Sequence, residues 1–141
     1  MNKIIRMEEE EAKTFDICGQ IIGAAMKVHS TLGPGFLESV YQNALIWELR
    51  KLGIKAEAER AITVRDDGQI VGAFTADILV NDSTIVELKA GLAIAKVHEV
   101  QLVNYLVATG LDEGVLLNFG AARLEFKKKL RLPKQAEEVS F

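Results

Sequence analysis

Residues 75–89 read TADILVNDSTIVELK, and this stretch decides the fold. Two runs rich in aliphatic and β-branched side chains flank the polar triplet at 81–83, a pattern typical of two antiparallel strands joined by a tight turn. If the triplet forms the loop, Val80 lies opposite Thr84, and each earlier residue of the first strand has a fixed partner in the second. The stretch therefore predicts a hairpin of known register.

That register brings charged side chains together. Counting back from the turn, Asp77 lies opposite Glu87, and directly opposed residues point to the same side of a sheet with Cβ atoms about 4.5–5.5 Å apart. Lys89 is two residues beyond Glu87, so it points to that side as well. The apolar side chains assigned to the other side, with the core, are Ile78, Val80, Val86 and Leu88. One face thus gathers two carboxylates and one ammonium group.

The charged face has two interpretations. Like charges placed directly opposite each other are destabilising, so the first is a solvated face on which Lys89 neutralises the carboxylates. In the second, Asp77 and Glu87 hold a divalent cation, since Mg²⁺ is commonly bound by one or two carboxylates together with water and phosphate oxygens. Lys89 would then orient or deprotonate a water molecule, or stabilise charge that develops on a phosphate. The hairpin alone leaves both open.

The rest of the chain alternates helical and extended patterns. Apolar spacings of three and four predict helices over 14–32, with Thr14 as N-cap, and over 36–52; Gly33-Pro34-Gly35 ends the first and Gly53 the second. The remaining pattern predicts strands over 54–64, 70–80 and 84–90, a helix over 95–109, and two further strands over 115–119 and 123–130. The sequence therefore predicts an α/β protein in which two helices precede a three-stranded antiparallel meander, followed by a helix and further strands.

Length and composition agree with one such domain. The 141 residues provide a single domain over 14–132, between a charged lead-in at 1–13 and a polar tail at 133–141. No apolar run approaches the ~20 residues of a membrane span, and the N-terminus lacks the apolar core of a secretory signal, so we expect a cytoplasmic protein. The net charge of −3 argues against a protein that coats nucleic acid by bulk charge. The lone Cys18 is interpreted as a core thiol.

Two helices contribute further polar candidates. Gln101 and Tyr105 are four residues apart and His98 precedes Gln101 by three, so the three share one stripe that either faces phosphate or marks a helix boundary. The apolar contacts of that helix are assigned to Val97, Val100, Val103, Leu106 and Val107. Glu38 lies in the first turn of the second helix, at the edge of its apolar face, where it either complements the helix dipole or binds a cation.

Two basic features remain open to a structural interpretation. His29 lies on the apolar stripe of the first helix, where a packed and hydrogen-bonded histidine is favoured over a phosphate or metal contact. Residues 127–129 are three lysines in the last strand. They would either follow a phosphate backbone or protect a solvated edge strand against aggregation.

The ordered motifs resemble those of a known family. Residues 35–41, GFLESVY, resemble the signature of the GxxExxY family, a small bacterial and archaeal group in the PD-(D/E)XK nuclease superfamily. The other stretches that resemble it are 28–35, 76–80, 86–90, 98–106 and 117–120, so the resemblance covers roughly residues 15–130. The residue before Asp77 is alanine where the superfamily's name has proline, at a position that is loosely kept.

The resemblance implies a restriction-endonuclease-like core and a metal-dependent nuclease site. It implies that Asp77 is the principal ligand of Mg²⁺ or Mn²⁺, that Glu87 is the second acid and Lys89 the catalytic lysine, and that Glu38 is the helical acid and a further metal ligand. Gln101 and Tyr105 match the Q-xxx-Y motif of RecB-like members, which supports the active site and contacts substrate.

The function expected from this resemblance is hydrolysis of phosphodiester bonds by in-line attack of water, with DNA as the first candidate among nucleic acids. The alternative is a catalytically silent nuclease-fold module that binds nucleic acid or a protein partner. A different metal hydrolase or a structural domain would instead place Asp77 and Glu87 on opposite faces of the sheet. A domain this small embraces little nucleic acid alone, which makes a homodimer a further expectation.

Overall fold

The computed structural model describes residues 16–131 as three helices and five strands. The helices are α2 (Ile17–Leu32), α3 (Glu38–Lys51) and α4 (Lys96–Thr109), and the strands are β1 (Ala56–Asp66), β2 (Gln69–Val80), β3 (Thr84–Lys89), β4 (Glu113–Asn118) and β5 (Glu125–Leu130). The expected lead-in at 1–13, the cap at Thr14 and the tail at 133–141 lie outside the described residues.

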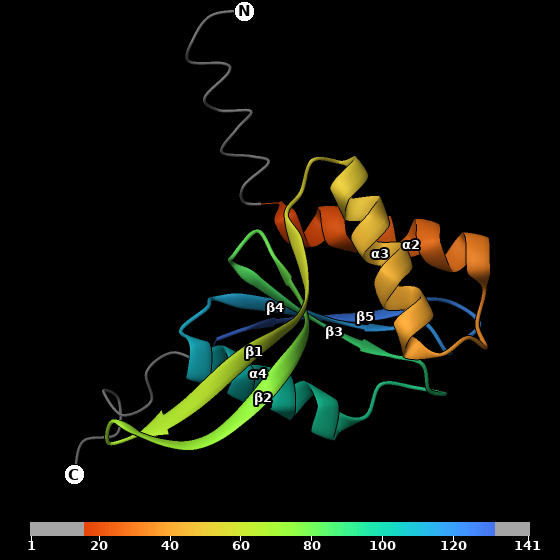
Figure 1. The fold of residues 1–141 in the computed structure, drawn as a ribbon. Helices are drawn as coiled ribbons and strands as arrows, with labels where there is room; N and C mark the ends of the chain where they lie inside the picture. The colour runs from red at the N-terminus through yellow and green to blue at the C-terminus, as the bar shows by residue number, and fades with distance from the viewer. Residues whose placement is uncertain (1–15, 132–141) are drawn as a thin grey trace, which may run out of the picture.

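These elements form three layers with the sheet in the middle (Figure 1). Helices α2 and α3 cover one face of the sheet, and α4 covers the other. The strand order is β1-β2-β3-β4-β5, with β3 and β4 parallel and the other neighbours antiparallel. The predicted α/β architecture, with its antiparallel meander and mixed sheet, is confirmed.

The hairpin of β2 and β3 has the predicted register. Val80 pairs with Thr84 and Ile78 pairs with Val86. The turn places Asn81 at φ 56°, a left-handed conformation that asparagine tolerates better than most residues. Because β3 and β4 are parallel, their carboxyl ends meet at the same edge of the sheet.

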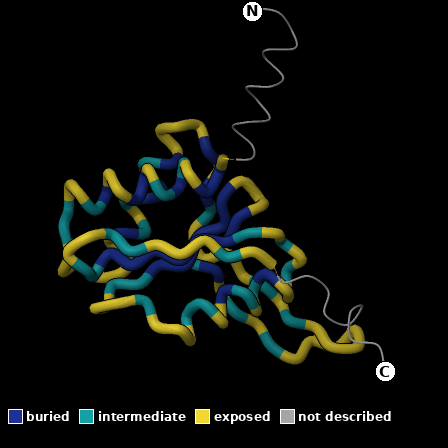
Figure 2. The backbone as a smooth tube through the Cα atoms, turned by 180° about the vertical axis from the view of Figure 1, so that it is seen from behind, coloured by how far each residue is buried: buried dark blue, intermediate teal, exposed yellow. Residues whose placement is uncertain are grey.

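Buried side chains form one cluster on each face of the sheet, and among the described residues burial is concentrated in the middle of the sheet (Figure 2). The cluster under α2 and α3 receives the residues that strand alternation assigned to it, Ile78, Val80, Val86 and Leu88. The cluster under α4 contains Leu79, Ile85 and Leu116 of the sheet. The sheet is therefore buried on both faces at its centre, where a charged side chain is costly.

The face that α4 buries corrects the sequence pattern. Val97, Val100 and Val107 were assigned to the core, but they are 67%, 50% and 57% exposed. Of the assigned residues, Leu106 is fully buried as expected, and Leu102, which was not assigned, is fully buried as well. Helical spacing shows that apolar residues share a stripe, but the neighbouring layer selects which stripe is buried.

Candidate active site

Asp77 and Glu87 lie side by side across the hairpin, on the face predicted from the register. The Asp77 amide donates a hydrogen bond to Glu87 Oε1 at 3.3 Å, and Asp77 Oδ2 accepts a hydrogen bond from the Leu88 amide at 2.7 Å. Each carboxylate is therefore anchored to the backbone of the opposite strand. This shared face is incompatible with the alternative that needs the two acids on opposite sides of the sheet.

The regular strand pairing is interrupted at Asp77. In the β1–β2 ladder, the paired positions are Ala58 with Ile78 and then Arg60 with Ala76, so the pair between Glu59 and Asp77 is missing. Glu59 has φ 52°, which is left-handed and rarely adopted in a strand. Followed back from the turn, the β2–β3 pairing also ends at Ile78, so it does not include Asp77. Side-chain hydrogen bonds hold the chain where strand pairing does not.

Burial and charge together perturb Glu87. The residue is only 9% exposed, and its pKa is raised well above the ordinary value, first by desolvation and then by the negative charge of Asp77 and a hydrogen bond between the two side chains. The Lys89 ammonium acts in the opposite direction on the Glu87 pKa. Two carboxyl groups this close cannot both ionise cheaply without a cation.

Lys89 is half-buried at the end of β3, next to the acidic pair. Within residues 16–131, no ion pair joins its ammonium group to Asp77 or Glu87. Its influence on Glu87 is electrostatic, at longer range. Lys89 is therefore not a tight ion-pair partner of either acid among the described residues.

Helix α3 reaches the site through Gln42, a residue that the sequence did not single out. The Gln42 side-chain amide donates a hydrogen bond to the backbone carbonyl oxygen of Asp77 at 2.7 Å. Glu38 lies four residues earlier, on the same side of the helix and one turn closer to its N-terminus. The signal that could have found Gln42 is this spacing from Glu38.

Glu38 itself is exposed and opens α3, two residues later than the helix was predicted to begin. The delay has a local cause, since Leu37 is extended at φ −69° and ψ 154°. Among residues 16–131, no three acidic, histidine or cysteine side chains lie close enough to hold a metal ion together. The structure therefore joins Asp77 with Glu87 and leaves Glu38 apart from them. Its first-turn position suits the helix dipole.

Tyr105 of α4 lies within electrostatic range of the acidic pair. Its ring stacks on Phe74 of β2, with ring centroids 3.6 Å apart. Burial raises the Tyr105 pKa, and the charges of Glu87 and Asp77 raise it further. Gln101, one turn before it, is exposed. His98 Nδ1 accepts a hydrogen bond from the Ala95 amide at 3.3 Å and so supports the start of the helix.

A buried tyrosine fixes the loop that leads into α3. The Tyr41 hydroxyl donates to the Gly33 carbonyl oxygen at 2.5 Å and accepts from the Phe36 amide at 3.1 Å. Its ring stacks on Phe119. His29 Nε2 is hydrogen-bonded to the Ala121 carbonyl oxygen at 2.9 Å, which confirms a packed structural histidine.

The basic last strand is engaged in ion pairs. Lys128 pairs with Glu113 at 3.6 Å, and Lys129 pairs with Glu99 at 2.7 Å. β5 is also an edge strand. These contacts favour the interpretation of the lysines as protection of a solvated edge over the alternative of a track for phosphates.

The donor set at the hairpin fits a hard divalent cation. Asp77 and Glu87 provide carboxylate oxygens, and each uses one oxygen for a backbone hydrogen bond. Mg²⁺ commonly takes one or two carboxylates and keeps several waters, so two acids suffice. A bound cation would also offset the repulsion that perturbs Glu87.

Comparison with known proteins gives one family. Residues 15–129 match the family model described as "PD-(D/E)XK nuclease superfamily". A solved structure described as "Crystal structure of SSO0001" has TM-score 0.51 and 17% sequence identity, over 71% of this chain and 53% of that chain. The chain thus spans about half the length of that structure, and at this identity the likeness concerns the fold. No curated protein matches the sequence.

Proposed function

The chain belongs to the PD-(D/E)XK nuclease superfamily, and from this premise we propose that it is a metal-dependent nuclease that hydrolyses phosphodiester bonds of DNA. Within the superfamily, residues 35–41 support assignment to the GxxExxY family. The observation that carries the proposal is the close pair of Asp77 and Glu87 on one face of the hairpin, beside Lys89. Family membership alone would be compatible with a decayed site, whereas this pair retains the required groups.

Asp77 and Glu87 hold Mg²⁺ or Mn²⁺ in this proposal, with Glu38 as a further ligand. When bound, the cation supplies charge neutralisation at the scissile phosphate and lowers the pKa of water. For Glu38 to join the other two acids, the substrate or water must bridge the gap, since the three do not form one cluster within the described residues. Glu38 would then act through a water ligand, as is common for Mg²⁺.

Lys89 assists the attacking water and stabilises negative charge on the phosphate, because it is adjacent to the acids without being tied to them. Tyr105 is held by Phe74 at the margin of the acidic pair and would position phosphate or Lys89. Gln101 is exposed one turn away, where its amide can reach substrate. Water then displaces one phosphate oxygen in line.

Cleavage of plasmid and single-stranded DNA by the purified protein with Mn²⁺ or Mg²⁺ tests the proposal. We expect activity that chelation removes and that falls at least about 100-fold in Asp77→Ala and Lys89→Ala, because both remove groups that act in the transition state. Glu48→Gln, which breaks ion pairs with Lys27 and Lys51 away from the site, serves as the control and should remain active. Equal activity of wild type and both variants, or none on DNA and RNA substrates, would overturn the proposal.

A catalytically silent module that binds nucleic acid or a protein is the second candidate. The separation of Glu38 from the other acids, among residues 16–131, is the observation that favours it. Titration calorimetry separates the two candidates. Saturable Mn²⁺ binding that Asp77→Ala abolishes supports the nuclease, while no binding by the wild type at millimolar metal supports the silent module.

A further inference from the structure

We infer that Gln42 is a positioning residue that holds Asp77 in the conformation required for metal binding. The expected effect on metal binding rests on the function proposed above. The positioning of Asp77 by Gln42 is a property of the metal-free protein. The inference comes from one contact, the hydrogen bond from the Gln42 side-chain amide to the Asp77 carbonyl oxygen at 2.7 Å.

Both backbone polar groups of Asp77 are bonded to side chains. Its amide donates to Glu87 Oε1 at 3.3 Å, and its carbonyl oxygen accepts from Gln42. The residue sits where the β1–β2 ladder lacks a pair, opposite Glu59 in its left-handed conformation. A backbone group at a break in a sheet needs another partner, because a polar group left unpaired in a half-buried position is costly.

The position of the Asp77 carboxylate depends on this backbone conformation. Asp77 Oδ2 accepts the Leu88 amide at 2.7 Å, a bond that requires the aspartate to point across the hairpin. Without Gln42, the unpaired carbonyl favours a shift of the strand towards other partners. The carboxylate would then lose its fixed place beside Glu87.

Gln42 also links the two acidic elements of the site. It lies one helical turn after Glu38 on α3, so a single side chain connects the helix that carries Glu38 to the strand that carries Asp77. Precise sites need such supporting contacts, because their ligands must be held within a fraction of an ångström.

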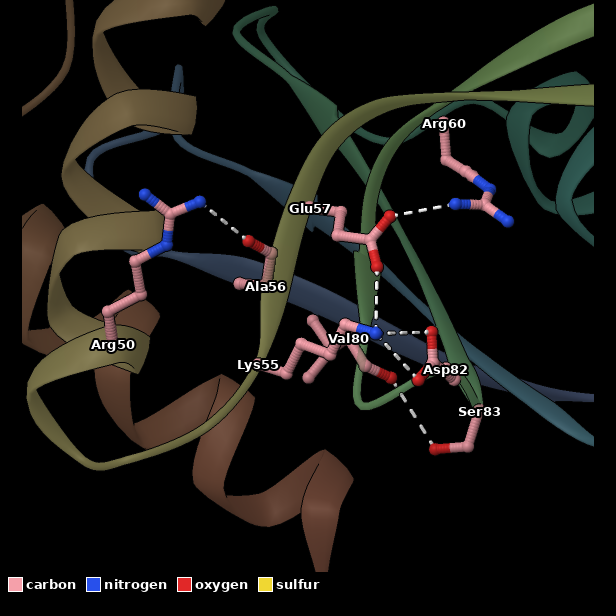
Figure 3. A network of polar contacts seen from close by, with 8 residues as sticks. All are labelled: Arg50, Lys55, Ala56, Glu57, Arg60, Val80, Asp82 and Ser83. Carbon is pink, nitrogen blue, oxygen red and sulfur yellow. Dashed lines mark hydrogen bonds and ion pairs between the residues drawn. The ribbon is translucent and has the colours of Figure 1, made fainter.

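Gln42→Met removes the donor and keeps a side chain of similar length. Arg50→Met is the matched control: Arg50 lies on the same helix and donates to the Ala56 carbonyl oxygen of β1 at 3.0 Å, in the polar network shown in Figure 3, away from the acidic pair. Both variants lose one hydrogen bond from α3 to the backbone at the neighbouring strands. They differ in whether that bond ends at Asp77.

Amide hydrogen exchange of the metal-free proteins, measured by NMR, tests the positioning. In Gln42→Met, we expect the Leu88 amide to exchange about fivefold to tenfold faster relative to the remaining core amides, the loss that corresponds to one hydrogen bond. In Arg50→Met, Leu88 should follow the other core amides. A Leu88 exchange rate that changes no more in Gln42→Met than in Arg50→Met would overturn the inference.

Mn²⁺ affinity and cleavage then test the consequence. Gln42→Met should bind Mn²⁺ about tenfold or more weakly, since loss of a supporting contact typically lowers metal affinity by 10–100-fold, and added Mn²⁺ should restore part of its cleavage rate. Unchanged Mn²⁺ affinity in Gln42→Met, beside a wild type that binds the metal, also overturns the inference. A wild type that neither binds Mn²⁺ nor cleaves refutes the proposed function instead, and Leu88 exchange still decides whether Gln42 positions Asp77.

Discussion

At the scale of one residue, Glu87 shows that the hairpin face differs from an ordinary solvated surface. An ordinary exposed glutamate remains ionised near neutral pH, but Glu87 is buried against Asp77 and its pKa is raised. In the metal-free folded protein, the carboxyl therefore holds its proton more tightly than in the unfolded chain. Folding stability consequently falls as pH rises from the unfolded value of about 4.5 through the raised folded value.

Glu87→Gln should remove this pH dependence. The glutamine oxygen still accepts the Asp77 amide, and its NH₂ group donates permanently to the Asp77 carboxylate. In EDTA near pH 8, we expect the variant to be more stable than wild type by on the order of 1–3 kcal/mol. Thermal unfolding of both proteins between pH 4 and pH 8 measures the difference.

With metal bound, the wild type should become more stable than Glu87→Gln. Mn²⁺ is expected to raise the unfolding temperature of the wild type and to have little effect on Glu87→Gln, because ligand binding stabilises only the folded state that binds it. Glu48→Gln, a surface change at two ion pairs, should keep the metal effect. A wild type whose metal-free stability increases between pH 5 and pH 8 would contradict the assignment of Glu87.

At the scale of elements, the exits of β3 and β4 are fastened to each other. The buried Asn118 accepts the Gly91 amide at 3.0 Å and donates to the Gly91 carbonyl oxygen at 3.1 Å. Gly120 packs against the same loop so closely that a Cβ there would lie 2.5 Å from the carbonyl carbon of Ala90. These contacts fix the backbone of the loop directly after Lys89, at the edge of the sheet where the parallel strands β3 and β4 both end.

Gly120→Ala should therefore destabilise the protein by about 1–3 kcal/mol, because the obstructing atoms are backbone and cannot move aside as a flexible side chain would. Gly23→Ala is the matched control: Gly23 lies on the exposed side of α2, and a Cβ there would meet nothing within 4 Å. That change should stabilise by about 0.5–1 kcal/mol through helix propensity. Urea unfolding of both variants measures the two effects, and equal stability of the two variants would disprove the account.

At the scale of the whole molecule, about half of the lysines and arginines among residues 16–131 form ion pairs with the protein's own acids. Ion pairs with aspartate or glutamate involve Lys27, Lys51, Lys55, Arg60, Lys128, Lys129 and Arg131. The network of Lys55, Glu57 and Asp82 in Figure 3 is one example. With a net charge of −3, the sequence does not favour binding to a phosphate backbone by bulk positive charge. Specific contacts at the proposed site must then provide most of the free energy of DNA binding.

The salt dependence of DNA binding should be shallow. We expect the plot of log affinity against log salt to have a slope shallower than about −3, since each phosphate neutralised on duplex DNA contributes about −0.9. Fluorescence anisotropy of labelled DNA, with Mg²⁺ and the Lys89→Ala variant to prevent cleavage, gives the slope. A slope of about −6 or steeper would show that a broad basic surface carries the binding.

The sequence by itself determined the hairpin and the order of elements. Strand alternation and a short polar turn assign Asp77, Glu87 and Lys89 to one face, and the register of Val80 with Thr84 agrees. Glycine at 53 and 110 marks where helices end. These features are local, because side-chain direction in a strand alternates with every residue whatever the strand packs against.

Only the tertiary structure decided how the layers meet. Periodicity assigned Val100 to the contacts of α4, whereas the sheet buries Leu102. The spacing from Glu38 places Gln42 on the same side of α3, but only the packing of α3 on the sheet makes Asp77 its partner. Both outcomes depend on residues distant in sequence, 35 positions apart for Gln42 and Asp77. Backbone geometry within one strand or helix determines which side chains share a face. What that face contacts depends on how the helices and the sheet pack together, and every layer contributes to that packing.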